Sequence, residues 1–305
     1  MPLIECVPNV SEGRRADVIA AIGDAIAIPG VRVLDRSSDP SHNRSVYTFA
    51  GEPDAIRDAV LRLFTVAIDA IDLRTHDGIH PRMGAVDVVP FVPLVSATIE
   101  ECVALAKDTA ALVAERCRVP VFLYEDAAAT DERRSLANIR RGGVDGVARR
   151  MQQAAWRPDF GPSQPHPTAG ATAIGARPIL IAYNVNLASN RLGVAKRIAS
   201  SIRASNGGLP HVKALGMQLD HGILQVSMNL TNYKETSMAA AFDAIVREAA
   251  ADGVRVLESE IVGLVPADAL PADPARRLKL RAEDLDKVLE KRLETNNGNR
   301  KTNIT

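Results

Sequence analysis

The sequence predicts a mixed α/β protein built from two ferredoxin-like subdomains, because the element order βαββαβ occurs twice along the chain. Its 305 residues exceed the roughly 100 to 200 residues of one typical domain, which favours two packed units. Aromatic residues supply only 4% of the chain and hydrophobic residues 46%, so Val, Ile, Leu and Ala must form the cores. We expect the two subdomains to pack around a central cleft, the usual place for a ligand.

Hydrophobic periodicity defines the elements of the first half. Pro29 and Gly30 end its first helix, and Pro53 opens the second, where a missing N–H would be unpaired in any case. The expected elements are a strand over 3–10, a helix over 16–28, strands over 31–35 and 45–51, a helix over 53–71, a strand over 85–92, a helix over 97–117 and a strand over 119–124. The last two extend a first βαββαβ unit.

The pattern weakens over 126–167, where the string WRPDFGP at 156–162 cannot form one regular element. Beyond it we expect a strand over 179–187, a helix over 192–205, strands over 212–219 and 223–230, a helix over 238–251 and a strand over 254–262. The expected domains are therefore a first subdomain, 1–167, a second subdomain, 168–270, and a C-terminal helix with a frayed tail, 271–305.

Charge and cysteine usage exclude several classes of partner. Lys plus Arg equals Asp plus Glu, 37 each, so no overall field would attract nucleic acid or an anionic membrane. No apolar run approaches the roughly 20 residues that span a bilayer. Cys6, Cys102 and Cys117 are odd in number and lack metal-type spacing, which favours reduced thiols over a disulfide framework. We expect a cytoplasmic protein.

The segment 74–84, RTHDGIHPRMG, holds the densest group of chemically capable residues, between an expected helix and an expected strand. His76 and His80 have the spacing of a helical metal pair, but the glycine and proline nearby disfavour a helix and no third ligand is evident. We therefore expect no metal. An imidazole can take and return a proton near neutral pH, and Arg82 can hold a carboxylate in a bidentate fork. Solvated loop histidines are the competing interpretation.

A second group lies in the turn-rich bridge 35–44 between two expected strands. Asn43 can satisfy a donor and an acceptor on a heterocycle, and Arg44 can neutralise a carboxylate. In the competing interpretation the bridge is a solvated loop, and Asp39 only forms its turn with the following proline.

A third group is the segment 161–170, which prolines stiffen and which glycines at both ends open to close backbone approach by a ligand. An interdomain linker is the competing interpretation. Its residues are Gly161, Pro162, Ser163, Gln164, Pro165, His166, Pro167, Thr168, Ala169 and Gly170.

Two expected strands of the second half carry alternating polar residues. Asn184 and Asn186 share one strand, and Ser227 and Asn229 share another. These side chains would either face a ligand or hydrogen-bond within the sheet, and we favour the second interpretation. The phosphate-binding motifs GxxxxGKS and GxGxxG are absent from the sequence, as is the esterase motif GxSxG, so we expect neither a nucleotide nor an esterase triad.

Three strings together resemble the glutamate formiminotransferase family, the transferase half of formiminotransferase-cyclodeaminase. They are ECVPNVSEG at 5–13, NRSVYT at 43–48 and HPRMGAVDVVPF at 80–91. The stretches 156–163 and 182–187 are similar to the same family in the same order, so the resemblance covers residues 1–270. The HPRMG string is its most specific part.

The resemblance implies a homodimer of two-subdomain chains, folate in the cleft between the subdomains, and His80 as the catalytic acid/base residue. It places the folate-contacting segment on 161–170, although residues 164–168 replace more aromatic and apolar residues of the animal pattern. A carboxylate of that pattern is missing, since Ser37 occupies its place. We therefore take Asp39 as the substitute and include it with Asn43 among the substrate- and folate-binding residues.

The implied reaction moves the formimino group of N-formimino-L-glutamate to N5 of tetrahydrofolate, a step of histidine degradation and one-carbon metabolism. Tetrahydrofolate is then a co-substrate, His80 moves the proton, and Arg44 and Arg82 hold substrate carboxylates. The helical cyclodeaminase half is not part of this sequence, so a separate cyclodeaminase is a candidate partner. Formyl transfer to the same folate position, a non-catalytic folate-binding protein and a ferredoxin-like duplication that serves an interface are the alternatives.

Overall fold

The structure is a computed structural model that describes residues 1–78, 81–219 and 222–298. The chain divides into two compact units, Met1–Arg177 and Pro178–Thr305. The sequence placed this boundary after residue 167. The strand β7 (Thr172–Ala176) accounts for the difference, because it pairs with two strands of the first unit. Among the described residues, no helix is both long and apolar enough to cross a membrane.

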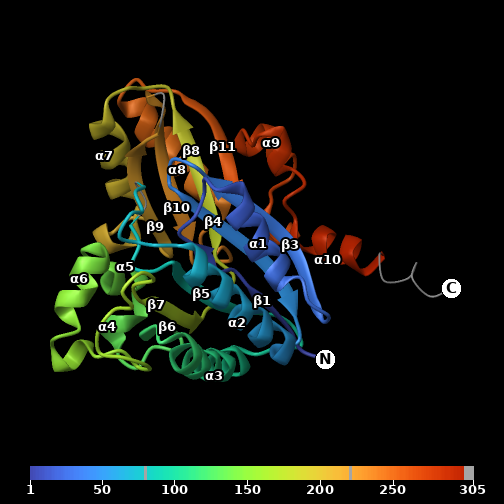
Figure 1. Cartoon of the computed structure of the whole chain (residues 1–305). Coiled ribbons are helices and arrows are strands. Elements are labelled where there is room, and N and C mark those ends of the chain that lie inside the picture. The colour runs from blue at the N-terminus through green and yellow to red at the C-terminus, as the bar shows by residue number, and fades with distance from the viewer. Residues whose placement is uncertain (79–80, 220–221, 299–305) are drawn as a thin grey trace. The chain divides into compact units, whose positions relative to one another are not determined.

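The first unit contains a seven-stranded sheet and six helices within its described residues (Figure 1). Its other strands are β1 (Leu3–Cys6), β2 (Asn9–Val10), β3 (Val31–Asp39), β4 (Arg44–Gly51), β5 (Val86–Val95) and β6 (Val121–Glu125). Its helices are α1 (Ala16–Ile26), α2 (Pro53–Ala70), α3 (Ile99–Cys117), α4 (Asp131–Arg134), α5 (Leu136–Arg140) and α6 (Gly143–Arg150).

The sheet order is β1-β4-β2-β5-β7-β6, with β3 on the outer side of β4. The expected strand 3–10 is split into β1 and β2 because Pro8 has no N–H to donate to a ladder. Both pieces still pair with β4 and β5, antiparallel in each case. Strand β7 adds in parallel between β5 and β6, so the sheet is mixed.

Helices cover both faces of this sheet. Strand β6 shows the reason, since its side chains alternate between the faces. Val121 and Leu123 pack into a core with α1, α2 and α3. Phe122 and Tyr124 point the other way and are covered by α5, α6 and the single tryptophan, Trp156. The weakly patterned connection thus shields the aromatic side of β6.

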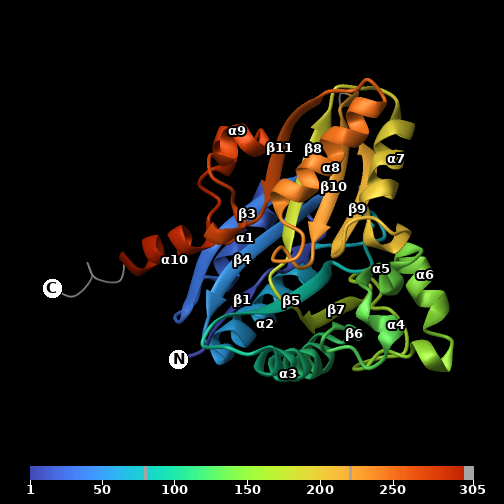
Figure 2. The same cartoon turned by 180° about the vertical axis from the view of Figure 1, so that it is seen from behind.

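The second unit has a four-stranded antiparallel sheet in the order β11-β8-β10-β9. Helices α7 and α8 pack on one face of it and share its apolar core (Figure 2). The elements are β8 (Ile181–Leu187), α7 (Leu192–Ile202), β9 (Val212–Gln218), β10 (Leu224–Leu230), α8 (Met238–Ala251), β11 (Val256–Val262), α9 (Pro274–Leu278) and α10 (Leu289–Gly298).

The mixed α/β class and the βαββαβ order of the second unit are confirmed. The ferredoxin-like designation and the central cleft stay predictions. One final helix was expected after residue 271, but α9 and α10 are separated there. The connection between them runs beside β11 and the residues that follow it, where Leu280 bridges Ser259 of β11 and Val288 bridges Val265.

Glu5 is a buried carboxyl on β1, 6% exposed, between Ala50 of β4 and Val92 of β5. Burial raises the pKa of Glu5 to about 7, although the positive charge of Arg177 opposes this shift. In the unfolded chain the same group titrates near 4.5. The folded state therefore holds a proton that the unfolded state loses between these two pH values, so stability falls as pH rises through that window and is level above it.

We expect Glu5→Gln to remove this pH dependence, because an amide needs no proton to stay neutral. The wild type should lose about 3 kcal/mol more than the variant between pH 4.5 and pH 7. The free energy of unfolding, followed by the fluorescence of Trp156 in urea, reports on the first unit alone. If the free energy of unfolding changed equally with pH in wild type and variant, Glu5 would be ionised in the folded state.

Candidate functional site

The segment that follows His80 is fixed on both sides by backbone contacts of the first unit. His80 itself lies outside the described residues. Ser11 Oγ donates to the carbonyl of Gly84 at 2.7 Å. On the opposite side, the Ala171 N–H donates to the Met83 carbonyl at 2.9 Å, and the strand-like contact continues to a bridge between Gly84 and Gly170. Met83 and Gly84 of the HPRMG string are therefore clamped between Ser11 and residues 170–171.

The C-terminal half of the segment 161–170 contacts the 74–84 loop, whereas its first residues lie elsewhere. The Leu73 N–H donates to the Thr168 carbonyl at 2.8 Å, which joins the segment to the start of the 74–84 loop. Gly161 and Pro162 instead line a hollow of about 380 Å³ with Ala114, Glu115 and Arg118 at the end of α3. The structure thus separates the first residues of the segment from the last ones.

The tautomer of His166 follows from its contacts. Its backbone exchanges two hydrogen bonds with Gly170, 2.7 and 3.0 Å long, which closes a tight loop. Inside the loop, the Ala169 N–H donates to His166 Nδ1 at 3.1 Å. A backbone N–H can only donate, so Nδ1 carries no proton and the neutral ring holds its proton on Nε2. Burial lowers the pKa of His166, which favours this neutral form.

Asn43 joins two loops through both ends of its amide. Its Oδ1 accepts the Gly13 N–H at 2.9 Å, and its Nδ2 donates to the Asp77 carbonyl at 2.8 Å. The residue is 7% exposed and has a left-handed backbone, with φ at 47°. Asparagine tolerates this conformation better than most residues. Asn43 therefore connects the SEG turn at 11–13 to the 74–84 loop.

His76 and Arg82 contact each other within the 74–84 loop. Arg82 Nη1 lies against His76 Nδ1, and Arg82 Nη2 donates to the Gly78 carbonyl at 2.6 Å. Because a guanidinium has no acceptor, His76 Nδ1 accepts and its proton lies on Nε2. That Nε2 is buried without a hydrogen-bond partner among the residues that the structure describes. Burial, with the charge of Arg82, lowers the pKa of His76, so this ring is neutral.

Asp39 ends β3 as an ionised carboxylate. The His42 N–H donates to its Oδ1 at 2.8 Å, and His42 Nδ1 lies 3.3 Å from Oδ2. The hydrogen bond from the His42 side chain, against burial, lowers the pKa of Asp39 to about 2. Its side chain is 50% exposed. Whether it supports His80 stays a prediction, since His80 lies outside the described residues.

Asp87, at the start of β5, is a deeply buried carboxylate, 3% exposed. Its Oδ1 accepts the Met83 N–H at 2.8 Å. Its Oδ2 lies 2.6 Å from Arg140 Nη2, an ion pair without the alignment of a regular hydrogen bond. Asp87 therefore connects the HPRMG string to α5.

Arg44, at the start of β4, lies beside this pair. Its Nη2 donates to Asn9 Oδ1, and Asn9 is the sheet partner of Val88, the residue after Asp87. Burial, reinforced by the like charge of Arg140, lowers the pKa of Arg44 to about 10. Arg44 and Arg140 thus form a neighbouring pair of cations.

The structure brings Asp87 and Arg140, which the sequence analysis did not single out, next to the predicted residue Arg44. Asp87 carried a signal, because an acidic residue interrupts an otherwise apolar strand in which a charge is costly unless it is paired. Arg140 carried none, since it lies in the weakly patterned connection and the long-range contact with Asp87 appears only in the fold.

A polar network covers one face of the sheet in the second unit. Asn184 Nδ2 donates to Glu260 at 2.9 Å, and Asn186 Nδ2 donates to Glu258 at 3.1 Å. Arg281 pairs with both carboxylates, at 2.9 and 2.8 Å. Bonding within the sheet, the interpretation that we favoured for the two asparagines, accounts for these contacts. The amide nitrogens of both asparagines are therefore already used in hydrogen bonds within the sheet.

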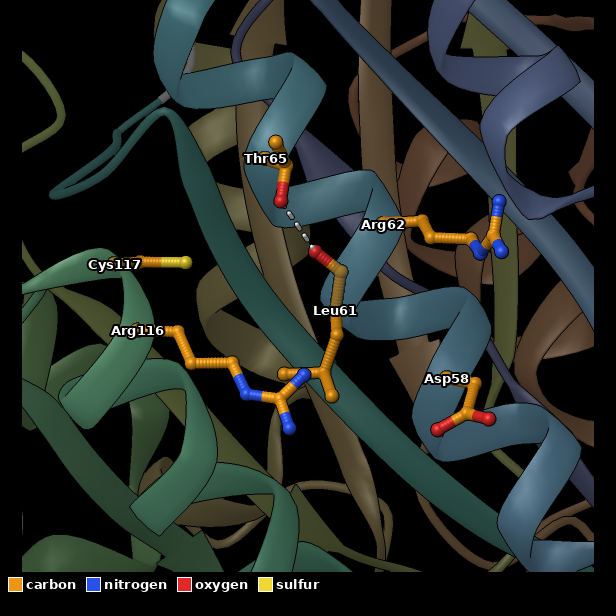
Figure 3. Close-up of a pocket in the computed structure, with 6 residues that line it drawn as sticks. All are labelled: Asp58, Leu61, Arg62, Thr65, Arg116 and Cys117. Atoms are coloured by element: carbon orange, nitrogen blue, oxygen red, sulfur yellow. Dashed lines mark hydrogen bonds between the residues drawn. The ribbon is translucent and has the colours of Figure 1, made fainter.

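A hollow of about 310 Å³ lies between α2 and the end of α3 in the first unit (Figure 3). Arg116 extends from α3 towards Leu61, whereas Arg62 points away from it. The hydroxyl of Thr65 is used within α2, where it donates to the Leu61 carbonyl at 3.1 Å. The two guanidinium groups do not converge, so the hollow has no arrangement for a ligand. Within the described ranges, no three His, Cys, Asp or Glu side chains form a metal-type group; the expectation of no metal stays untested, since His80 lies outside them.

Two family models match consecutive parts of the chain. Residues 3–177 match the N-terminal subdomain of the formiminotransferase domain, and residues 182–288 match the formiminotransferase domain. The gap between the matched ranges contains the boundary between the two compact units, after Arg177. The family models and the structure therefore divide the chain in the same place.

Curated relatives match over nearly the whole length. A glutamate formimidoyltransferase of Streptococcus pyogenes is 45% identical over 95% of this chain and 98% of its own. A glutamate formimidoyltransferase of Thermoplasma acidophilum is 46% identical over 96% of this chain and 98% of its own. A formimidoyltransferase-cyclodeaminase of Dictyostelium discoideum is 43% identical over 88% of this chain and 51% of its own.

We expect Gly84→Ala to disrupt the clamp around the HPRMG string. A Cβ there would lie 2.0 Å from the Ala171 carbonyl oxygen and 2.8 Å from that of Val86, so backbone must move. Thermal denaturation should show destabilisation of about 1–3 kcal/mol. Gly193→Ala is the matched control, since nothing lies within 4 Å of its Cβ and alanine favours helix α7. Equal melting temperatures for the two variants would contradict the tight approach at Gly84.

Proposed function

Because this chain belongs to the formiminotransferase family, we propose that it transfers the formimino group of N-formimino-L-glutamate to N5 of tetrahydrofolate. The products are 5-formiminotetrahydrofolate and L-glutamate. The observation that carries the proposal is the group of guanidinium side chains around Asp87, next to the clamped HPRMG string. A doubly charged donor such as formimino-glutamate needs cationic groups of this kind.

The reaction requires little beyond alignment and proton transfer. The N5 amine attacks the amidine carbon, and the new N–C bond gives a tetrahedral intermediate. Breaking the bond from that carbon to the glutamate nitrogen then releases L-glutamate. The proton lost by N5 must reach the leaving nitrogen, and one imidazole can carry it. We assign this proton transfer to His80, whose neighbouring segment 81–84 is rigidly held. Asp39 is the proposed carboxylate support.

The donor is held by arginines in this proposal. Arg44 receives one carboxylate and Arg82 another. Arg82 uses one N–H of each terminal nitrogen for His76 and Gly78, which fixes the plane of the guanidinium. His76 is thereby a positioning residue for Arg82.

Tetrahydrofolate is the co-substrate, and the segment 161–170 is its proposed contact. His166 presents Nε2–H as a fixed donor for the pterin. Asn43 has both ends of its amide engaged, so its contribution is to hold two loops of the site together. The proposal extends to a cytoplasmic homodimer that works with a separate cyclodeaminase.

A spectrophotometric assay tests this function. Purified protein is mixed with formimino-glutamate and tetrahydrofolate, the 5-formimino product is converted to the absorbing methenyl form, and formyl-glutamate serves as a parallel donor. Turnover with the formimino donor is expected. Folate binding without turnover would reject the proposed reaction, and turnover with the formyl donor alone would replace it.

His80→Ala should lower kcat by about a hundred- to ten-thousand-fold, because positioned acid/base catalysis contributes that much. The dissociation constant for tetrahydrofolate should stay close to that of the wild type. His211→Asn is the matched control: His211 pairs with Glu235 at 3.1 Å in the second unit, and asparagine tolerates its φ of 58°. Near-normal turnover of His80→Ala would remove His80 from the catalytic role.

His166→Asn should raise the KM for tetrahydrofolate by up to about tenfold with kcat little changed, because one neutral hydrogen bond is lost. Asparagine Oδ1 replaces Nδ1 as the acceptor of the Ala169 N–H, so the loop should keep its shape. Steady-state kinetics with varied tetrahydrofolate measure the effect. An unchanged KM would limit His166 to closing its own loop.

A further inference from the structure

The charges around Asp87 do not balance. Arg140 Nη2 lies 2.6 Å from its carboxylate. Burial lowers the pKa of both Arg44 and Arg82, and the charge of Asp87 opposes that shift in each. One buried carboxylate thus serves three guanidinium groups. Asp39 also acts on Arg44 and Asp77 on Arg82, but the Asp39 side chain is half-exposed and that of Asp77 is 80% exposed. A buried excess of positive charge is stabilised when an anion binds beside it.

Arg44 and Arg140 also contain donors for which the described part of the chain supplies no acceptor. The Nε atoms of both are buried and have no hydrogen-bond partner among the residues that the structure describes. The Arg140 side chain is only 15% exposed. A buried N–H of a charged group that lacks an acceptor is unfavourable, so nearly all such groups are paired in native proteins. An acceptor from outside the chain would satisfy them.

Both arginines are held next to the HPRMG string. Arg44 contacts Asn9, which pairs with Val88 across the sheet. Arg140 contacts Asp87, which binds the Met83 N–H at 2.8 Å. Two elements distant in sequence, β4 and α5, therefore bring cations to the start of β5.

We propose that Arg140 and Arg44 together bind one carboxylate of the glutamate donor, and that Asp87 positions Arg140 for this contact. The inference rests on the proposed function and adds a substrate-binding residue to it. A carboxylate fits because its two oxygens can accept from both guanidinium groups while its charge offsets theirs. Asp87 acts through Arg140, since both of its oxygens are engaged with the protein.

The test compares the KM for both substrates in Arg140→Gln, whose amide removes the charge but can still donate to a carboxylate. The KM for formimino-glutamate should rise about tenfold or more, since a charged hydrogen bond is lost. The KM for tetrahydrofolate should stay near the wild-type value, whereas the melting temperature should fall because Asp87 loses its buried partner. Product inhibition by L-glutamate should weaken by the same factor. Arg140→Lys keeps an ion pair with Asp87, and therefore the fold, and should give a smaller rise.

Arg141→Ala is the matched control, because Arg141 is exposed and its side chain donates to Asn138 within its own turn at 2.6 Å. Its kinetics should equal those of the wild type. A folded Arg140→Gln or Arg140→Lys variant with wild-type KM and wild-type inhibition by L-glutamate would overturn the inference. A wild type without turnover would instead reject the proposed function. Calorimetric titration of L-glutamate into wild type and Arg140→Gln would then decide the role of Arg140 independently.

Discussion

The candidate site depends on the burial of one carboxylate, that of Asp87. Its two oxygens connect the Met83 N–H of the HPRMG string to Arg140 of α5, and its charge acts on Arg44 and Arg82. Breaking a buried pair from one side leaves an uncompensated charge, which costs about 3–5 kcal/mol. Asp87 therefore determines both the position of the string and the local electrostatic potential. In the proposed function, a substrate anion completes this charge arrangement.

Backbone contacts make this arrangement rigid. The string is clamped between Ser11 and Ala171, and Gly84 is required because the facing carbonyl leaves no room for a Cβ. Asn43 connects two further loops at a left-handed backbone position. Loops that are fixed in this way can hold a proton-transfer group within the short distances that catalysis needs. The loop of His166 is fixed by the same means, and its contacts select one tautomer of the ring.

Much of this could be predicted from the sequence, because hydrophobic periodicity reports local structure directly. The long helices α1, α2, α3, α7 and α8 and most strands follow it, and the HPRMG string marked the place of the candidate site. Strand β7 could not be found, since the string TAIGA has few residues that favour strands and is defined only by its pairing with β5 and β6. Arg140 was missed for a related reason. Its role depends on a contact with Asp87 across a long stretch of chain, and no local pattern encodes it.

The central claim is that an excess of buried guanidinium groups in the first unit selects a ligand with two carboxylates. Isothermal titration of the wild type with L-glutamate and with L-glutamine tests it most directly, because the two ligands differ in one charge. The account predicts that L-glutamate binds about tenfold more tightly or better, since a charge-assisted pair is lost with the amide. Equal affinities for the two ligands would contradict it.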